Sequence, residues 1–210
     1  IISLYKTRRL DAFEFSEEEN IYLGYVKYLR DHQFVDFDDL ILYTQELLKT
    51  NEEMKTYYQQ YFEHILIDEF QDTDVIQYDI IKMLGISHKN VFVVGDPDQS
   101  IYAFRGSHYA NNQKFLNEFS ANQIILDQNY RSTNDILNAA NLLINHNQNR
   151  ILGKELKSDL GLGQQVTFYT AQNDYQETYF VIDEIRRLKR QGISYQDIAI
   201  LYRNNALSRI

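Results

Sequence analysis

Two short apolar runs, each followed at once by a polar cluster, constrain the fold of this chain more than any other feature. Ile65–Ile67 precedes the Asp-Glu-Phe-Gln-Asp-Thr segment 68–73, and Val91–Val94 precedes the Gly-Asp-Pro-Asp-Gln-Ser segment 95–100. Helical spacing of apolar residues near 75–84 supplies a crossover between two parallel strands. The pattern predicts a βαβ unit with both polar clusters at the carboxyl edge of one sheet, where open α/β sheets bind ligands.

The acidic pair after the first run indicates chemistry on phosphates. Asp68 suits a hard cation such as Mg²⁺, which keeps several waters and takes one or two protein carboxylates beside substrate phosphates. Glu69 would then activate the attacking water. Taken alone, the Asp-Glu dipeptide is more simply interpreted as a solvated turn, and the surrounding sequence is what favours the functional interpretation.

Composition excludes several classes of protein. The 210 residues, 44% of them hydrophobic, allow one large or two small domains, and the absence of Cys rules out a disulfide framework or a thiolate metal site. No apolar run approaches membrane-spanning length, so we expect no membrane partner. The absence of Cys fits a reducing, cytoplasmic setting. A net charge of −9 argues against a broad basic surface for nucleic acid, so any such contact must be local.

Local signals predict the helices of the first half. Residues 16–31 and 36–62 have helical patterns. The acidic residues Asp36, Asp38 and Asp39 resemble a metal cluster, but helix capping and favourable interaction with the helix dipole explain them better.

A second α/β unit is predicted to begin near residue 121. After the apolar run Gln123–Leu126, Ser132 or Thr133 would cap a helix. The Gly161-x-Gly163 pair lacks the rest of a dinucleotide-binding fingerprint and is interpreted as a turn. The remaining predicted elements are the run Val166–Tyr169, a helix over about 175–190 with a solvated basic face (Arg186, Arg187, Lys189, Arg190), and a strand at Ile198–Tyr202.

Three long motifs in order resemble those of superfamily 1 DNA helicases of the UvrD/PcrA/Rep group, and the resemblance covers nearly the whole chain. Residues 68–73 match the family's Walker B motif, 95–106 its third motif and 128–133, Gln-Asn-Tyr-Arg-Ser-Thr, its fourth. Weaker agreement comes from 36–40 and 199–209. No Gly-x-x-x-x-Gly-Lys-Ser/Thr loop is present, and Ile1 starts the chain without Met, so we expect an internal fragment that hydrolyses little ATP alone.

The resemblance implies an α/β fold made of partial RecA-like P-loop NTPase motor domains, with parallel sheets flanked by helices and a helical N-terminal segment. Residues 1–60 would end an inserted helical subdomain and lead into the motor. Residues 61–120 would form the later half of the first motor domain, and residues 121–210 the early half of the second, with ATP bound between the two.

The resemblance also assigns roles around ATP. Asp68 would coordinate Mg²⁺ through water, Glu69 would be the catalytic base, and Gln99 would touch the γ-phosphate or the attacking water. Arg131 would reach ATP as an arginine finger, and Tyr130 would stack on the adenine. Without the motifs, Gln99 would be interpreted as a surface turn residue and Tyr130 as a core aromatic.

Five residues are assigned to DNA by the same resemblance. Tyr102 and Phe104 would stack on single-stranded bases, which tolerates any sequence, although the family often has Trp at position 104 and both rings have core packing as an alternative. Arg105 would lie near DNA or form a structural salt bridge with the Walker B acids. Asn204 and Arg209 would lie near the DNA path of the second domain.

The predicted function is an ATP- and Mg²⁺-dependent DNA helicase that moves 3′ to 5′ on single-stranded DNA. It would act at single-strand/duplex junctions in repair or replication, with repair or replication proteins as partners. One alternative is the helicase part of a RecB- or AddA-like helicase-nuclease, but the Asp-Gln-Ser-Ile-Tyr loop favours the UvrD-like group. Another is a non-catalytic DNA-binding module, against which intact Glu69, Gln99 and Arg131 argue.

Overall fold

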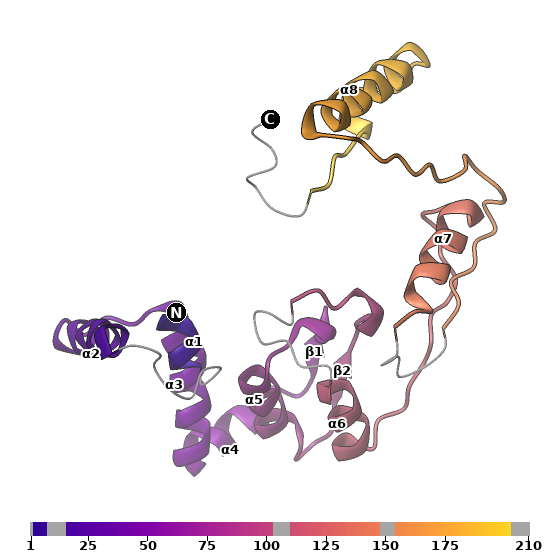
Figure 1. Cartoon of the computed structure of the whole chain (residues 1–210). Helices are drawn as coiled ribbons and strands as arrows, with labels where there is room; N and C mark the ends of the chain where they lie inside the picture. The colour runs from indigo at the N-terminus through magenta and orange to yellow at the C-terminus, as the bar shows by residue number, and fades with distance from the viewer. Residues whose placement is uncertain (1, 8–15, 103–109, 148–153, 203–210) are drawn as a thin grey trace. The chain divides into compact units, whose positions relative to one another are not determined.

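The computed structural model describes residues 2–7, 16–102, 110–147 and 154–202. These fall into two units: the first extends to Asn129 and includes Ala140–Lys157, and the second contains Tyr130–Ala139 and the residues from Ser158 onward. The elements labelled in Figure 1 and the short 3₁₀ turns between them are α1 (Ile2–Lys6), α2 (Ser16–Asp31), α3 (Phe37–Thr50), α4 (Glu52–Tyr61), β1 (Ile65–Ile67), η1 (Phe70–Asp72), α5 (Val75–Gly85), β2 (Val91–Val93), η2 (Pro97–Gln99), α6 (Ala110–Phe119), α7 (Asn134–Ile144), α8 (Asp174–Arg190) and η4 (Tyr195–Asp197).

The predicted βαβ unit is confirmed. Strands β1 and β2 pair in parallel with Ile65 opposite Val91 and Ile67 opposite Val93. Helix α5 makes the crossover, and a capping box begins it: the Asp74 carboxylate accepts from the Gln77 N–H, and the Gln77 side chain accepts from the Asp74 N–H. The described part of the chain is otherwise mainly helical.

Aromatic side chains make the core beneath the two strands. Phe70, Tyr78, Phe115 and Phe119 are buried together, and Ile67, Val91 and Val93 of the strands pack against them. The Phe115 and Phe119 rings stack with centroids 4.7 Å apart, and the Phe70 ring meets Phe115 edge-on at 5.4 Å. Because Phe70 follows Glu69 directly, this core anchors the polar segment that leaves β1.

The prediction of a helix over 36–62 is wrong in one respect, because the segment forms two helices, α3 and α4. Asn51 has an extended backbone and ends α3, and its side chain accepts a hydrogen bond from the Met54 N–H to begin α4. Asn competes for backbone hydrogen bonds in this way, which favours caps over helix interiors. Helix α3 packs on α5, where Gln45 Nε2 donates to Asp79 Oδ2 over 2.8 Å.

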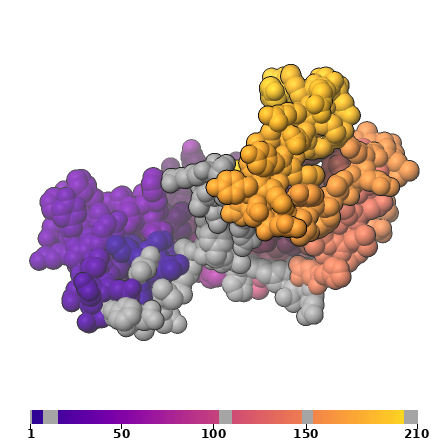
Figure 2. Space-filling view, turned by 45° about the horizontal axis from the view of Figure 1, so that its top comes forward, coloured from indigo at the N-terminus to yellow at the C-terminus, as the bar shows by residue number. Residues whose placement is uncertain are grey.

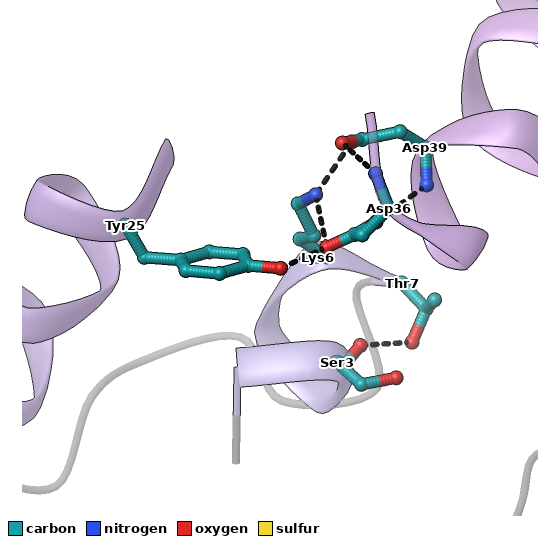
Figure 3. Close-up of polar contacts among 6 residues, drawn as sticks. All are labelled: Ser3, Lys6, Thr7, Tyr25, Asp36 and Asp39. Atoms are coloured by element: carbon teal, nitrogen blue, oxygen red, sulfur yellow. Dashed lines mark hydrogen bonds and ion pairs between the residues drawn. The ribbon is translucent and has the colours of Figure 1, made fainter. Parts of the chain in front are cut away.

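The capping interpretation of the 36–39 segment is confirmed. Asp36 accepts from the Asp39 N–H, Asp39 accepts from the Asp36 N–H, and the described residues contain no acidic or His cluster suited to a metal. Figure 3 shows the addition that the sequence did not indicate: Lys6 Nζ donates to Asp36 over 2.8 Å and to Asp39 over 2.6 Å, while the Tyr25 hydroxyl donates to Asp36. Three helices therefore meet at one polar cluster.

The strand predicted at Ile198–Tyr202 is wrong: this segment has no strand pairing within the described chain. The runs at 123–126 and 166–169 likewise form no strand among the described residues. Their apolar side chains are largely exposed, as Leu126 (80%), Phe168 (97%) and Leu201 (94%) show. A strand needs a neighbouring strand for its backbone hydrogen bonds, and β propensity alone does not provide one.

The basic cluster on α8 is a solvated helix face, as predicted. Arg186 pairs with Asp183 at 3.2 Å, and Arg187 makes a two-point contact with Glu184. Figure 2 shows this orange-to-yellow part of the chain at the surface. Acidic neighbours three residues away thus pair with two of the four basic residues, Arg186 and Arg187. No helix among the described residues is long and apolar enough to cross a membrane.

Candidate functional site

The two polar clusters lie side by side because strand pairing continues beyond the strands themselves. The Val94 N–H donates to the Ile67 carbonyl over 2.8 Å, and the Phe70 N–H donates to the Val94 carbonyl over 2.9 Å. Asp68 lies between these bonds with its carboxylate exposed, and its Oδ1 accepts from the Glu69 N–H over 2.9 Å. The carboxyl ends of β1 and β2 thus form one continuous polar edge.

Glu69 has a left-handed backbone, with φ 50° and ψ 41°. This conformation costs about 1–2 kcal/mol for a residue other than Gly. The adjoining Phe70 is 1% exposed and holds the turn in place, while the Glu69 side chain remains exposed. The core therefore stabilises a strained turn that presents a carboxylate to solvent, an arrangement found preferentially at functional sites.

Gln71 connects the two clusters and is 4% exposed. Its Nε2 donates to Glu69 Oε2 over 2.6 Å, and its Oε1 accepts from the Asp96 N–H over 2.9 Å. A backbone N–H only donates, so the second bond fixes which end of the amide faces Glu69. In addition, the Ser100 hydroxyl donates to the Gln71 carbonyl over 3.3 Å.

Asp96 organises the second cluster. The Gln99 Nε2 donates to Asp96 Oδ2 over 2.7 Å, the Asp98 N–H donates to Asp96 Oδ1 over 3.1 Å, and Lys154 forms an ion pair with the same carboxylate. Burial acts to raise the pKa of Asp96, but the contacts with Lys154 and Gln99 outweigh it and hold that pKa below its ordinary value. Asp96 is therefore held as an anion.

The donor set at this edge fits a hard divalent cation. Asp68 and Glu69 offer exposed carboxylate oxygens, the ligand type that Mg²⁺ takes, and two are enough when substrate oxygens and waters complete the coordination. The described residues contain no group of three candidate ligands, so they form no complete protein cage. The arrangement suits a cation that arrives with its substrate.

Tyr130 and Arg131 lie in the second unit, directly before α7. The Tyr130 side chain is 83% exposed, so its interpretation as a core aromatic is wrong, and Arg131 is exposed as well. Helix α7 begins at Asn134, immediately after Thr133, as the sequence predicted.

The Gly161-x-Gly163 turn packs on the start of α7. The Asn134 N–H donates to the Gly161 carbonyl over 2.9 Å, and the Gly163 N–H donates to Asp135 Oδ2 over 2.7 Å. These contacts fasten the turn to the helix, in agreement with its interpretation as a turn.

The residues assigned to DNA are described only in part. Tyr102 is half-buried, which fits neither a fully packed core ring nor a fully exposed one. The other four, Phe104, Arg105, Asn204 and Arg209, lie outside the described residues. All five roles stay predictions.

Comparison with known proteins identifies the family. Residues 5–120 match the UvrD/REP helicase N-terminal domain, and residues 124–210 match the UvrD-like helicase C-terminal domain. The chain belongs to the UvrD/REP helicase family. The resemblance found in the motifs of the sequence is thereby confirmed.

Two relatives of this UvrD/REP family chain carry the same name. It is 43% identical over 201 residues to "ATP-dependent DNA helicase PcrA" of Leuconostoc citreum, a match that covers 95% of this chain and 27% of the relative. It is 45% identical over 191 residues to the protein of the same name in Staphylococcus aureus strain Mu50, with 90% and 26% covered. The chain spans about a quarter of the length of these relatives.

Two contacts of the site were not predicted from the sequence. Gln71 lies within the Walker B segment, two residues after Glu69, and its position in the motif was the only available signal. Lys154 carried no signal at all, because nothing in the sequence relates it to Asp96, 58 residues earlier.

Proposed function

We propose that the complete protein is an ATP-dependent DNA helicase that couples ATP hydrolysis to 3′ to 5′ movement on single-stranded DNA. Family membership and the names of the relatives support this proposal. The observation that carries it is the hydrogen-bonded path from Glu69 through Gln71 and Asp96 to Gln99, which joins the two polar clusters. A motor requires such a connection between the group that acts on water and the loop that senses nucleotide.

In this proposal Asp68 and Glu69 have separate roles at the sheet edge. Asp68 would hold Mg²⁺ through water, and the ion would neutralise phosphate charge when bound with ATP. Glu69 would take the proton of the attacking water, which requires an exposed carboxylate in a fixed position. Gln99 would contact the γ-phosphate or that water, since its amide both donates and accepts hydrogen bonds.

We also propose the RecA-like architecture that the family implies. Residues 61–120 would belong to a first motor domain and 121–210 to a second, with 1–60 completing a helical subdomain. The two matched regions, which meet between 120 and 124, support the division, and the parallel pairing of β1 with β2 supports the fold.

The second motor domain would complete the nucleotide site. Arg131 would stabilise charge on the transferring phosphoryl group, and Tyr130 would stack on the adenine base. The exposure of both side chains supports these roles, because each must be accessible to a nucleotide.

DNA would be bound by stacking of its bases on aromatic side chains rather than by attraction to a broad basic surface. Tyr102 and Phe104 would contact successive bases, and Arg105, Asn204 and Arg209 would contact the strand nearby. The net charge of −9 supports local contacts of this kind rather than a basic surface. Single-strand/duplex junctions, met during repair or replication, are the proposed substrates.

The test is ATP hydrolysis by the complete protein, with and without single-stranded DNA, in the native form and as Glu69→Gln. We expect DNA-stimulated turnover that falls by about 10²-fold or more in the variant, because the proton acceptor is lost. Binding of a fluorescent ATP analogue should be retained. Turnover that is absent in the native protein, or unchanged in the variant, would reject the mechanism and favour a non-catalytic DNA-binding module.

A further inference from the structure

We propose that Gln71 is a positioning residue that orients the Glu69 carboxylate and fastens it to the loop carrying Gln99. This inference rests on the proposed function, because it assigns Glu69 the role of base. It adds a residue to which sequence reasoning gave no role. One buried amide, that of Gln71, has hydrogen bonds to two different partners.

Gln71 restrains the side chain of Glu69. Its side chain is exposed, and an exposed carboxylate is free to adopt several rotamers unless something holds it. The Gln71 Nε2 donates to Glu69 Oε2 over 2.6 Å, a short bond to a charged acceptor. That bond restricts the carboxylate to one position, which is what proton transfer from a placed water requires.

The other end of the Gln71 amide contacts the loop that carries Gln99. Gln71 Oε1 accepts from the Asp96 N–H, and Asp96 in turn accepts from Gln99 Nε2. A movement of the segment 95–99 would therefore shift the Gln71 amide, which holds the Glu69 carboxylate. The arrangement makes the position of the base depend on the position of the nucleotide-sensing loop.

The space around the Gln71 amide is narrow. A Cβ added at Gly95 would lie 2.6 Å from Gln71 Oε1 and 3.0 Å from the Phe70 nitrogen. Only Gly allows the loop to approach Gln71 this closely. Burial of Gln71 at 4% exposure also keeps bulk water from competing for the two bonds.

The decisive variant is Gln71→Glu in the complete protein. It keeps the shape and the acceptor for the Asp96 N–H but replaces the donor that faces Glu69 with a carboxylate oxygen. Gln71→Met is the second variant, because Met has a side chain of similar length but removes both hydrogen bonds. The matched control is Gln45→Met, which removes a 2.8 Å bond from a Gln amide to a carboxylate far along the chain, on α3.

The measurements are kcat and KM for ATP at saturating single-stranded DNA, with binding of a fluorescent ATP analogue. We expect kcat to fall about 10- to 100-fold in both Gln71 variants, with KM and analogue binding within about twofold of native, and Gln45→Met to match native in each. A native kcat in Gln71→Glu, or a loss of analogue binding in step with kcat, would overturn the positioning role.

A double variant separates this proposal from the proposed function. In single-turnover measurements, Gln71→Glu should change the residual rate of Glu69→Gln by less than about twofold, because its effect acts through Glu69. A further fall of tenfold or more in the double variant would overturn the proposal while leaving the helicase function intact. If Glu69→Gln alone hydrolyses ATP at the native rate, Glu69 is not the base, and the proposed mechanism fails together with the positioning role of Gln71.

Discussion

Lys6 Nζ lies 2.6 Å from Asp39 Oδ1, and each of these side chains is only 5% exposed. The same ammonium group lies 2.8 Å from Asp36 Oδ2. The partners are separated by 30 and 33 residues, so the cluster joins the short α1 to the start of α3. A buried charge is tolerated only when it is paired, and here one cation serves two carboxylates that also cap a helix.

Replacing Lys6 by Met should destabilise the start of α3 strongly, because the buried Asp39 and the partly exposed Asp36 both lose their cation. Breaking a buried pair costs about 3 kcal/mol or more. Hydrogen–deuterium exchange of α3 in the complete protein should accelerate by roughly a hundredfold. Lys49→Met is the control: the Lys49–Asp79 pair is half-exposed at 3.3 Å, so the loss should stay below about 1 kcal/mol. Equal effects of the two changes would contradict the assignment.

Acid should weaken this same cluster. Burial acts to raise the pKa of Asp36, but hydrogen bonds from Lys6, the Asp39 N–H and Tyr25 outweigh it and lower that pKa to about 2 from 3.8. A lowered folded-state pKa gives stability that is present above pH 4 and lost as the pH falls toward 2. The contribution is about 1 kcal/mol, allowing for solvent screening at the partly exposed Asp36. Urea midpoints between pH 5 and 2 should fall further in native protein than in Asp36→Asn.

Local signals in the sequence predicted what depends on neighbours along the chain. The capping box of Asp36 and Asp39 spans three residues, and the βαβ unit follows from two apolar runs and one helical pattern. Both need only short-range information. The acidic edge at Asp68 and Glu69 follows from the same pattern, since parallel strands place their carboxyl ends together.

Contacts between distant residues were beyond such reasoning. Neither Lys6 with Asp39 nor Lys154 with Asp96 has a signature in spacing, because the fold alone brings them together. The strand predicted at Ile198–Tyr202 failed for a related reason: β propensity describes a preference, and a strand also requires a partner. At Asn51 the misprediction had a local cause: the Asn51 cap divides the segment into two helices, although the apolar pattern continues across it.

Gly85→Ala should destabilise the βαβ unit by about 1–3 kcal/mol through overpacking. A Cβ at this position would lie 2.3 Å from Val91 Cγ2, where the end of α5 approaches β2. The free energy of unfolding, measured by hydrogen exchange of α5, should fall less when Gly85→Ala is made in a Val91→Ala background. Gly24→Ala is the matched control: no atom lies within 4 Å, so it should be neutral or slightly stabilising in helix α2. Additive effects at positions 85 and 91 would argue against the steric cause.

Arg131→Ala should lower DNA-stimulated ATP turnover of the complete protein by about 10³- to 10⁵-fold, the range measured for arginine fingers. Arg131→Lys should restore little, because an ammonium group lacks the planar, two-point geometry of guanidinium. The control is Arg186→Ala on α8, an exposed arginine paired with Asp183 at 3.2 Å, which should leave turnover unchanged. Binding of a fluorescent ATP analogue separates a loss of nucleotide binding from a loss of catalysis. Retained binding with lost turnover would support transition-state stabilisation by Arg131, whereas lost binding, or near-native turnover in Arg131→Ala, would contradict it.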